Sequence, residues 1–535
     1  MVPPRSSSEV PVFPQIVPLR PLRGHGIATG AGRLRPEPPD PVCHALLLRL
    51  NTLFSSDARE SCVHHPECTV RRPDLIADPV GPTLVRLVVP MLAGALGIVM
   101  FNVVDTFFVG RLGARELAAM SYTFPIVIVA GSIASGLGVG ASANVSRALG
   151  ARDRAAAERL TLHAYVLGFL VVVVIAVVGL ATIDSFFGML GAQPEIMGLI
   201  RSYMSIWYLG MPFVVLPMIG QNILQATGDS RTPSAAIVFA VTLNMILDPL
   251  LIFGLGPFPA LGIRGAALAT VIARSSSLVL VLSAVIGREK LMPAQLQLQL
   301  FGDSARRVLF VGVPAVLTNL ALPISMAVVT RLVSRFGAAA VAGFGVATRL
   351  ETFSLVFTFA LSMVFTPFVG QNLGAGRLQR VRSGHRVAAG MSLAWGVMVA
   401  LVFSVAGRPI AAIFNETEAV VATTTRYLWT VAPSFGLMGV VTLSAAAFNG
   451  MQRPFSAAAA AYLRLIGLSI PLAVIGRAVA GLPGLFAGLA AGNAIAGVTA
   501  YLWFQRSSVV LIGETAAAGA DDAAGVALTA DSAAQ

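Results

Sequence analysis

The sequence predicts an all-α integral membrane protein whose twelve transmembrane helices form two pseudo-symmetric bundles of six. Hydrophobic residues make up 56% of the 535 residues, charged residues only 12%, and the mean hydropathy is +0.80. Short motifs also recur 224 residues later, without insertions: Val89-Pro90 returns as Val313-Pro314, and Leu149-Gly150 returns as Leu373-Gly374. A repeat of this length indicates two fused membrane bundles, the usual architecture of a secondary transporter, rather than a solenoid.

A helix that spans a bilayer needs ~20 mostly apolar residues, and twelve segments meet this requirement. In the first half they are 87–110, 117–146, 160–183, 202–226, 233–256 and 265–287. In the second half they are 308–330, 339–370, 387–407, 427–452, 455–476 and 478–505. Glycine and proline inside these runs are compatible with membrane helices, because neighbouring groups satisfy the freed backbone atoms. The chain therefore divides into one six-helix bundle at 77–290 and a second at 291–506.

Basic residues gather in alternate loops. The loops between the second and third, sixth and seventh, and eighth and ninth segments are rich in arginine, whereas the loop 184–194 has no basic residue. Basic loops stay on the cytoplasmic side of a membrane. We therefore expect a multi-pass protein of the plasma membrane (the cell inner membrane), with both termini in the cytoplasm. The same rule accounts for the net charge of +12 without a nucleic-acid partner.

The two ends of the chain differ from the rest in composition. Residues 1–76 are rich in Pro, Arg and Ser, which predicts a disordered extension or a wrongly assigned start. Their cysteines, Cys43, Cys62 and Cys68, match no regular zinc spacing, so a metal site there is disfavoured and the role of the cluster stays open. The Ala-rich residues 507–535 are predicted to form a disordered tail.

Ionisable side chains within the apolar segments are candidates for function, because each costs ~2.5–3.5 kcal/mol to insert. Asp105 lies in the first segment and Asp248 in the fifth, where Asn244 shares its helical face and Pro249 frees a backbone carbonyl. Thr270 of the sixth segment could add a hydroxyl. Such an oxygen cluster suits a hard cation, or a proton held between close carboxylates. Alternatively, each aspartate only caps or pins a neighbouring helix.

The second half lacks this set, since Asp105 corresponds to Val329 at the repeat offset. It has its own charged residues, Arg349 and Glu351 in the eighth segment and Arg464 in the eleventh. Glu351 is expected either to be a polar group of the transport cavity or to pair with an arginine on a neighbouring helix. The roles of the two arginines stay open.

Motifs of soluble enzymes and of nucleotide-binding sites are missing from the sequence. We find no glycine-rich phosphate loop of the Walker type and no His-Glu-x-x-His motif. We therefore expect a protein that is not an enzyme, has no cofactor, and draws its energy from a gradient of protons or sodium ions rather than from ATP.

Four motifs resemble the multidrug and toxic compound extrusion (MATE) family, and its prokaryotic DNA-damage-inducible (DinF-like) branch more than its eukaryotic one. They lie at Val104–Gly113, Gln225–Pro233, Asn244–Pro249 and Gln371–Gly376. The resemblance covers residues ~80 to 506 and implies a multidrug efflux antiporter, acting as a monomer in membrane lipid. It would export organic, often cationic and lipophilic, compounds (xenobiotics among them) in exchange for protons or sodium ions.

The resemblance also implies a cation site in the first half. Its members match Asp105, Asn244, Asp248 and Thr270, which would also be the ligands of a sodium ion, and a proline that bends the first helix matches Pro90. This chain lacks the acidic residues that some relatives carry in the seventh and tenth helices, which weakens a second cation site. One rival interpretation is a lipid-linked saccharide flippase of the same broader superfamily, for which a more basic cavity is expected. A second, a membrane-embedded transferase, is disfavoured by the short loops.

Overall fold

The computed structural model describes residues 73–293 and 299–533, and the side chains of most of them up to Val509. Within these ranges the fold consists of helices and their connections, which confirms the predicted all-α class. Each of the twelve predicted segments coincides with a helix or with a run of consecutive helices. The N-terminal cysteines and nearly all of the extension 1–76 lie outside the described residues.

The first half of the chain forms a series of long helices. They are α2 (Val80–Gly110), α3 (Ala114–Gly150), α4 (Arg154–Met189), α5 (Pro194–Ala226), α6 (Arg231–Phe253) and α7 (Ile263–Ser283), followed by the π-helical turn η2 (Ala284–Arg288). Local sequence explains several of their ends. The Asp153 carboxylate accepts the backbone N–H of Ala156 and so caps the start of α4. Gly254, with φ 70°, ends α6 in the left-handed region.

The second half repeats this series with more interruptions. It contains α8 (Phe301–Val333), η3 (Ser334–Phe336), α9 (Ala338–Ser354), α10 (Val356–Gly374), α11 (Leu378–Phe414), α12 (Glu418–Val431), η4 (Ala432–Ser434), α13 (Phe435–Gly450), α14 (Pro454–Tyr462), η5 (Leu463–Ser469) and α15 (Ile470–Ala533). The predicted helix 339–370 is interrupted at Leu355, and the predicted helix 427–452 is interrupted at Pro433, where proline cannot donate a helical hydrogen bond. The last two predicted helices are joined as α15, with non-helical backbone at Ala480 and Gly481.

The backbone of α15 remains helical to Ala533, through the segment 507–533 for which the composition suggested disorder. Alanine has the highest helix propensity of all residues, which accounts for a helical backbone in so Ala-rich a sequence.

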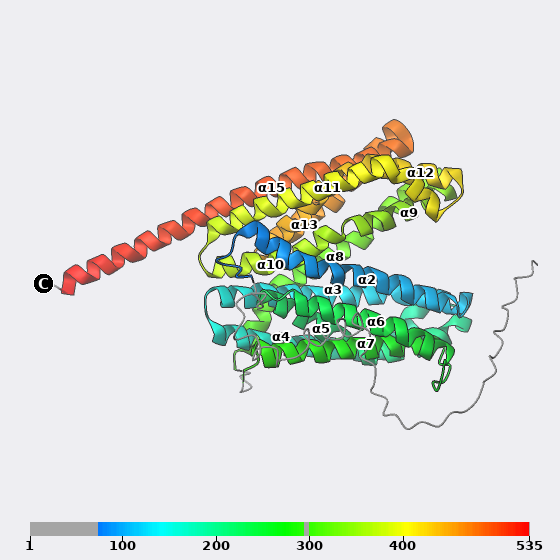
Figure 1. The fold of residues 1–535 in the computed structure, drawn as a ribbon, viewed down its shortest axis with the longest axis horizontal. Coiled ribbons are helices and arrows are strands. Elements are labelled where there is room, and N and C mark those ends of the chain that lie inside the picture. Colours follow the sequence, from blue (N-terminus) through cyan, green and yellow to red (C-terminus); the bar gives the residue numbers. More distant parts are fainter. Residues whose placement is uncertain (1–72, 294–298, 534–535) are drawn as a thin grey trace, which may run out of the picture. The chain divides into compact units, whose positions relative to one another are not determined.

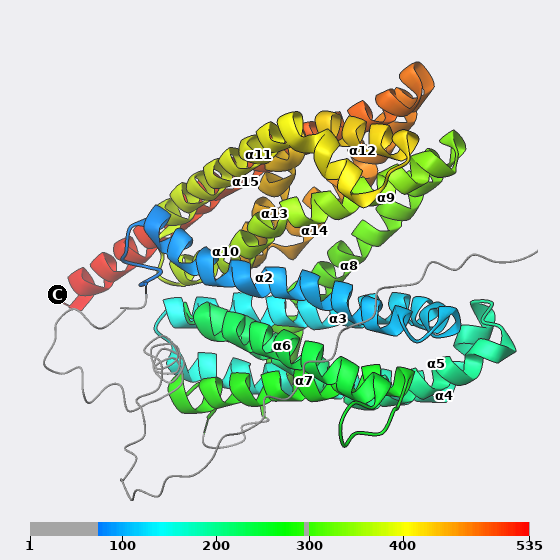
Figure 2. The ribbon, with the colours of Figure 1, turned by 45° about the vertical axis from the view of Figure 1, so that its right-hand side comes forward.

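The helices form two groups in chain order, α2–α7 in the lower part of Figure 1 and α8–α15 in the upper part, with α2 and α8 at the boundary between them. Because the loops 150–154, 288–301 and 374–378 carry many of the loop arginines, the end of the bundles that holds them is called here the arginine-rich end. Arg154 joins two of these loops, since its guanidinium donates to the backbone oxygen of Glu289 (2.7 Å). Figures 1 and 2 show the helices of the two groups diverging from the arginine-rich end toward the opposite end.

The two groups pack together mainly through α3, which lies against α8 and α10. Glycines allow the backbones to approach closely: Gly136 and Gly140 of α3 face Gly312 and Val308 of α8. A polar contact adds to this interface, since Asn144 donates its amide N–H to the carbonyl of Arg307 (3.2 Å). All of these contacts lie in the halves of α3 and α8 that are nearer the arginine-rich end.

Helix α2 contacts helices of both groups. Near the arginine-rich end its buried side chains, among them Leu84, Val88 and Met91, share a hydrophobic core with residues of α10, α11 and α13. Along its length α2 also packs against α6 of the first group. A displacement of α2 would therefore change the packing of helices in both groups.

Candidate functional site

The predicted site residues lie on three helices of the first group, α2, α6 and α7. Asp105 comes from α2, Asn244 and Asp248 from α6, and Thr270 from α7. Asp105 is 6% exposed, Thr270 7%, and the other two are fully buried. Helix α6 packs against both α2 and α7, and this packing brings the three helices together.

Asn244 and Asp248 are in direct contact. The amide Nδ2 of Asn244 donates to Asp248 Oδ1 over 3.1 Å, as expected for residues four apart on one helical face. Asp105 is close enough to Asp248 for the two carboxylates to interact electrostatically. Thr270 is buried on the adjacent helix α7, and among the described residues it makes no hydrogen bond to the aspartates.

Three buried oxygens of this cluster have no hydrogen-bond partner among the described residues: Asp105 Oδ1, Asn244 Oδ1 and Asp248 Oδ2. A buried polar atom without a partner is unfavourable, by ~1–3 kcal/mol and more for a charged group. All three are acceptors, and two belong to carboxylates. These three oxygens could bind a proton or a hard cation such as sodium, which prefers oxygen ligands.

Tyr203 of α5 is a member of the cluster that the sequence reasoning missed. It is 4% exposed and interacts electrostatically with both Asp105 and Asp248. Its repeat equivalent, 224 residues later, is Tyr427. A position-by-position comparison of the two halves shows this shared tyrosine as one of several positions that both copies carry.

Pro90 lies within α2, which is a continuous helix from Val80 to Gly110. Its backbone oxygen accepts a hydrogen bond from the hydroxyl of Ser234 on α6, and Gly94, one turn further, packs against the same serine. The proline therefore lies where α2 contacts the helix that carries Asn244 and Asp248. A bend of α2 at this position stays a prediction.

Glu351 lies in a separate polar cluster of the second group. Its carboxylate accepts a hydrogen bond from the hydroxyl of Tyr427 and interacts electrostatically with Arg464. Arg464 in turn donates to Asn493 Oδ1 over 3.4 Å. Glu351 therefore lies near an arginine of a neighbouring helix, but the described residues contain no ion pair between the two side chains. Arg349, two residues away, is exposed.

Comparison with known proteins agrees with this architecture. The family model MatE matches residues 90–250 and 314–475, one match in each half. The chain is 34% identical to the FAD transporter of Shewanella oneidensis, over 81% of this chain and 96% of that protein. It is 26% identical to the multidrug export protein MepA of Staphylococcus aureus, over 79% of this chain and 93% of that protein.

A solved structure is similar over almost its whole length. The MATE transporter VcmN of Vibrio cholerae in its bent form shares 31% identity with this chain, with a TM-score of 0.78, covering 81% of this chain and 97% of VcmN. These relatives are transporters rather than enzymes. With both halves matched by the family model, the chain belongs to the MATE family of membrane transporters.

Proposed function

We propose that this transporter is a secondary active antiporter that exports small organic compounds in exchange for protons or sodium ions. The observation that carries the proposal is the pair of buried carboxylates, Asp105 and Asp248, each with an oxygen that has no partner among the described residues. Buried acidic groups inside a membrane bundle are costly to keep unless they bind an ion or a proton. Asn244 supplies a neutral acceptor to the same site, and Tyr203 and Thr270 are proposed to complete its surroundings.

The packing of α2 supports a route from this site to the interface between the two groups. Asp105 lies in the half of α2 away from the arginine-rich end, whereas Leu84 and Met91 lie in a core shared with the second group. Binding of a cation would remove the repulsion between the carboxylates and allow α2 to shift relative to α6. Such a shift would change how α2 packs against α10, and so bias the arrangement of the two groups.

The direction of transport follows from the proposed orientation. We place the arginine-rich end in the cytoplasm on the positive-inside rule, with both termini on that side and the protein in the plasma membrane. The glycine contacts between α3 and α8 lie at that end, and the helices diverge toward the other. On this orientation we propose that the structure represents the outward-facing state, in which the cargo leaves and the cation enters.

Two classes of cargo are proposed. The resemblance of the sequence motifs supports organic cations, and the relative MepA, named a multidrug export protein, supports drugs more generally. The acidic site would exchange the coupling cation for this cargo. The relative from Shewanella oneidensis, named an FAD transporter, has the higher identity, 34% against 26%, and supports a flavin nucleotide. Both relatives are named for small molecules, which favours either cargo over a lipid-linked saccharide.

The test uses the purified full chain in proteoliposomes with an imposed proton or sodium gradient. Ethidium and FAD are offered in parallel, so that cargo and coupling ion are read from one experiment. Asp105→Asn and Asp248→Asn keep the shape of the side chains but remove their charge, and each is expected to abolish gradient-driven accumulation. Asp303→Asn, an exposed carboxylate on α8, is the matched control and should behave as the wild type. Wild-type coupling in both site variants would show that the site is wrongly assigned.

A further inference from the structure

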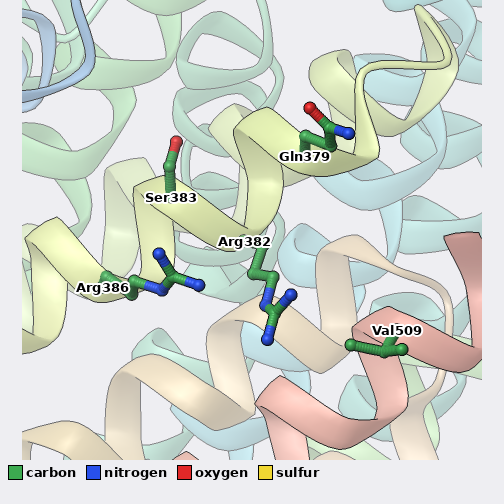
Figure 3. A pocket seen from close by; sticks show the side chains of 5 residues that line it. All are labelled: Gln379, Arg382, Ser383, Arg386 and Val509. Atoms are coloured by element: carbon green, nitrogen blue, oxygen red, sulfur yellow. The ribbon is translucent and has the colours of Figure 1, made fainter.

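A groove outside the transport site lies at the arginine-rich end, between the start of α11 and α15. Its volume is ≈ 380 Å³, and it is lined by Gln379, Arg382, Ser383, Arg386 and Val509 (Figure 3). The four α11 residues follow a helical spacing of three and four, so they form one face of the first two turns of that helix. The fifth comes from α15 and forms an apolar side of the groove.

Both arginines of the groove lack an acidic partner. Among the residues that the structure describes, neither Arg382 nor Arg386 forms an ion pair with a carboxylate, whereas Arg154, Arg201, Arg288 and Arg408 all do. Figure 3 shows both guanidinium groups on the side of α11 that faces α15. Two neighbouring guanidinium groups without a counter-charge repel each other and attract an anion, and their planar forks match the geometry of phosphate.

One of the two arginines is held in place by a buried hydrogen-bonded chain. Arg382 Nε donates to Gln505 Oε1 (2.9 Å), and Gln505 Nε2 lies 3.3 Å from Nδ1 of His385. His385 Nε2 lies 2.9 Å from the hydroxyl of Ser444, and both of these residues are fully buried. Since the glutamine amide donates to Nδ1, Nε2 carries the imidazole hydrogen. This series of hydrogen bonds uses only Nε of Arg382, which leaves both terminal NH₂ groups of its guanidinium for a ligand.

Both walls of the groove continue into the membrane as apolar surface. On α11, Leu393 and Val397 lie seven and eleven residues after Arg386 and are 40% and 60% exposed. On α15, Leu502 and Val498 lie seven and eleven residues before Val509 and are 48% and 50% exposed. These intervals keep the side chains on the face of the helix that lines the groove. A ligand with an anionic head and long apolar chains would fit both parts of this surface.

We propose that this groove is a binding site for an anionic phospholipid, with the headgroup phosphate between Arg382 and Arg386 and the acyl chains along the apolar faces of α11 and α15. A soluble phosphate would use the two guanidinium groups but would gain nothing from the apolar stripes. The bound lipid would join the start of α11 to α15 at the arginine-rich end. The groove does not include Asp105 or Asp248, so a test of lipid binding there is separate from a test of the proposed transport mechanism.

Native mass spectrometry of the full chain in neutral detergent tests the proposal. Phosphatidylglycerol, phosphatidylcholine and inorganic phosphate are titrated separately, and phosphate is also added in competition with phosphatidylglycerol. Phosphatidylglycerol should bind at least about tenfold more tightly than phosphatidylcholine, because each charge-assisted hydrogen bond contributes roughly a factor of ten. Preferential binding that inorganic phosphate removes at equal concentration would assign the groove to a soluble anion and overturn the lipid proposal.

Variants distinguish lipid binding in this groove from nonspecific attraction of lipid to the other positive charges of the same end. Arg382→Gln and Arg386→Gln should each weaken phosphatidylglycerol binding by about tenfold. Val509→Glu should weaken it through repulsion. Arg306→Gln removes one exposed arginine of α8 at the same end and should leave binding unchanged. Melting temperatures of all variants check that they are folded. Equal binding by the groove variants and the wild type, or an equal loss in Arg306→Gln, would refute the site.

Discussion

A methyl group added at Gly140 should open the contact between the two groups of helices. A Cβ atom at this position would lie 2.3 Å from the carbonyl oxygen of Val308 and 3.2 Å from the backbone nitrogen of Gly312. Both atoms belong to the backbone of α8, so no side-chain rotation can relieve the clash. To bring the closer pair to 3.0 Å, which real Cβ atoms essentially always exceed, α3 and α8 must separate by about 0.7 Å.

Overpacking of this kind costs about 1–3 kcal/mol. The cost applies only while the two helices are in contact, because a state in which they are apart has room for the methyl group. Gly140→Ala should therefore shift the equilibrium between the two arrangements roughly 5- to 150-fold toward the one separated at the arginine-rich end. Transport should slow, since the cycle needs both arrangements.

Pulsed electron paramagnetic resonance can measure this shift. Spin labels are placed at Ala155 and Gln379, which are exposed in the first turns of α4 and α11 and lie in different groups. The three native cysteines are first replaced by serine. The distance distribution of the Gly140→Ala protein should contain a longer component than that of the wild type.

Gly131 supplies the matched control, since it lies on the same helix and a Cβ atom there would meet nothing within 4 Å. Gly131→Ala should reproduce the wild-type distances, and both alanine variants should gain similar intrinsic helix propensity. If the Gly140→Ala and Gly131→Ala proteins give the same distance distribution, the backbone clash at Gly140 does not control the separation of α3 and α8.

Two further predictions concern hydrogen bonds. Tyr427→Phe removes the hydroxyl that donates to Glu351 and should lower the free energy of unfolding by ~1–3 kcal/mol, because it leaves a carboxylate oxygen without its donor. Thermal denaturation in detergent measures this change, and an unaltered melting temperature would contradict the contact. Ser234→Ala removes the donor to the Pro90 carbonyl and should cost ~1 kcal/mol. Hydrogen exchange of α2 should rise in this variant, and unchanged exchange would show that the bond does not hold the helix.

The sequence predicted the fold well, for physical reasons. Membrane helices must satisfy their own backbone hydrogen bonds, so long apolar runs can be read directly as helices. The interruptions were harder to predict. The break at Leu355 and the non-helical residues Ala480 and Gly481 lie inside runs that are apolar throughout. Hydropathy does not distinguish a straight helix from one divided by its tertiary contacts.

The candidate site was predictable in part. The contact between Asn244 and Asp248 follows from their spacing on one helix, and the structure contains it. The proximity of Asp105 depends on how α2 packs against α6, which no local pattern determines. Tyr203 was missed because a tyrosine in a membrane helix is usually a packing or interfacial residue. Its interactions with both aspartates become visible only when α5 is placed beside them.

The two tyrosines at equivalent positions of the repeat offer a reason why the proposed ion coupling would be concentrated in one half. Tyr203 lies near two carboxylates, and among the described residues neither carboxylate forms an ion pair with a basic side chain. Tyr427 contacts a single carboxylate, Glu351, whose charge Arg464 opposes. An acid whose charge a nearby arginine already compensates gains little from a bound cation, whereas two acids without such a neighbour gain the removal of their mutual repulsion. If the nearby arginine keeps Glu351 from binding ions, Arg464→Gln should add a second ion-dependent step to transport. Unchanged ion dependence in this variant would refute that role of Arg464.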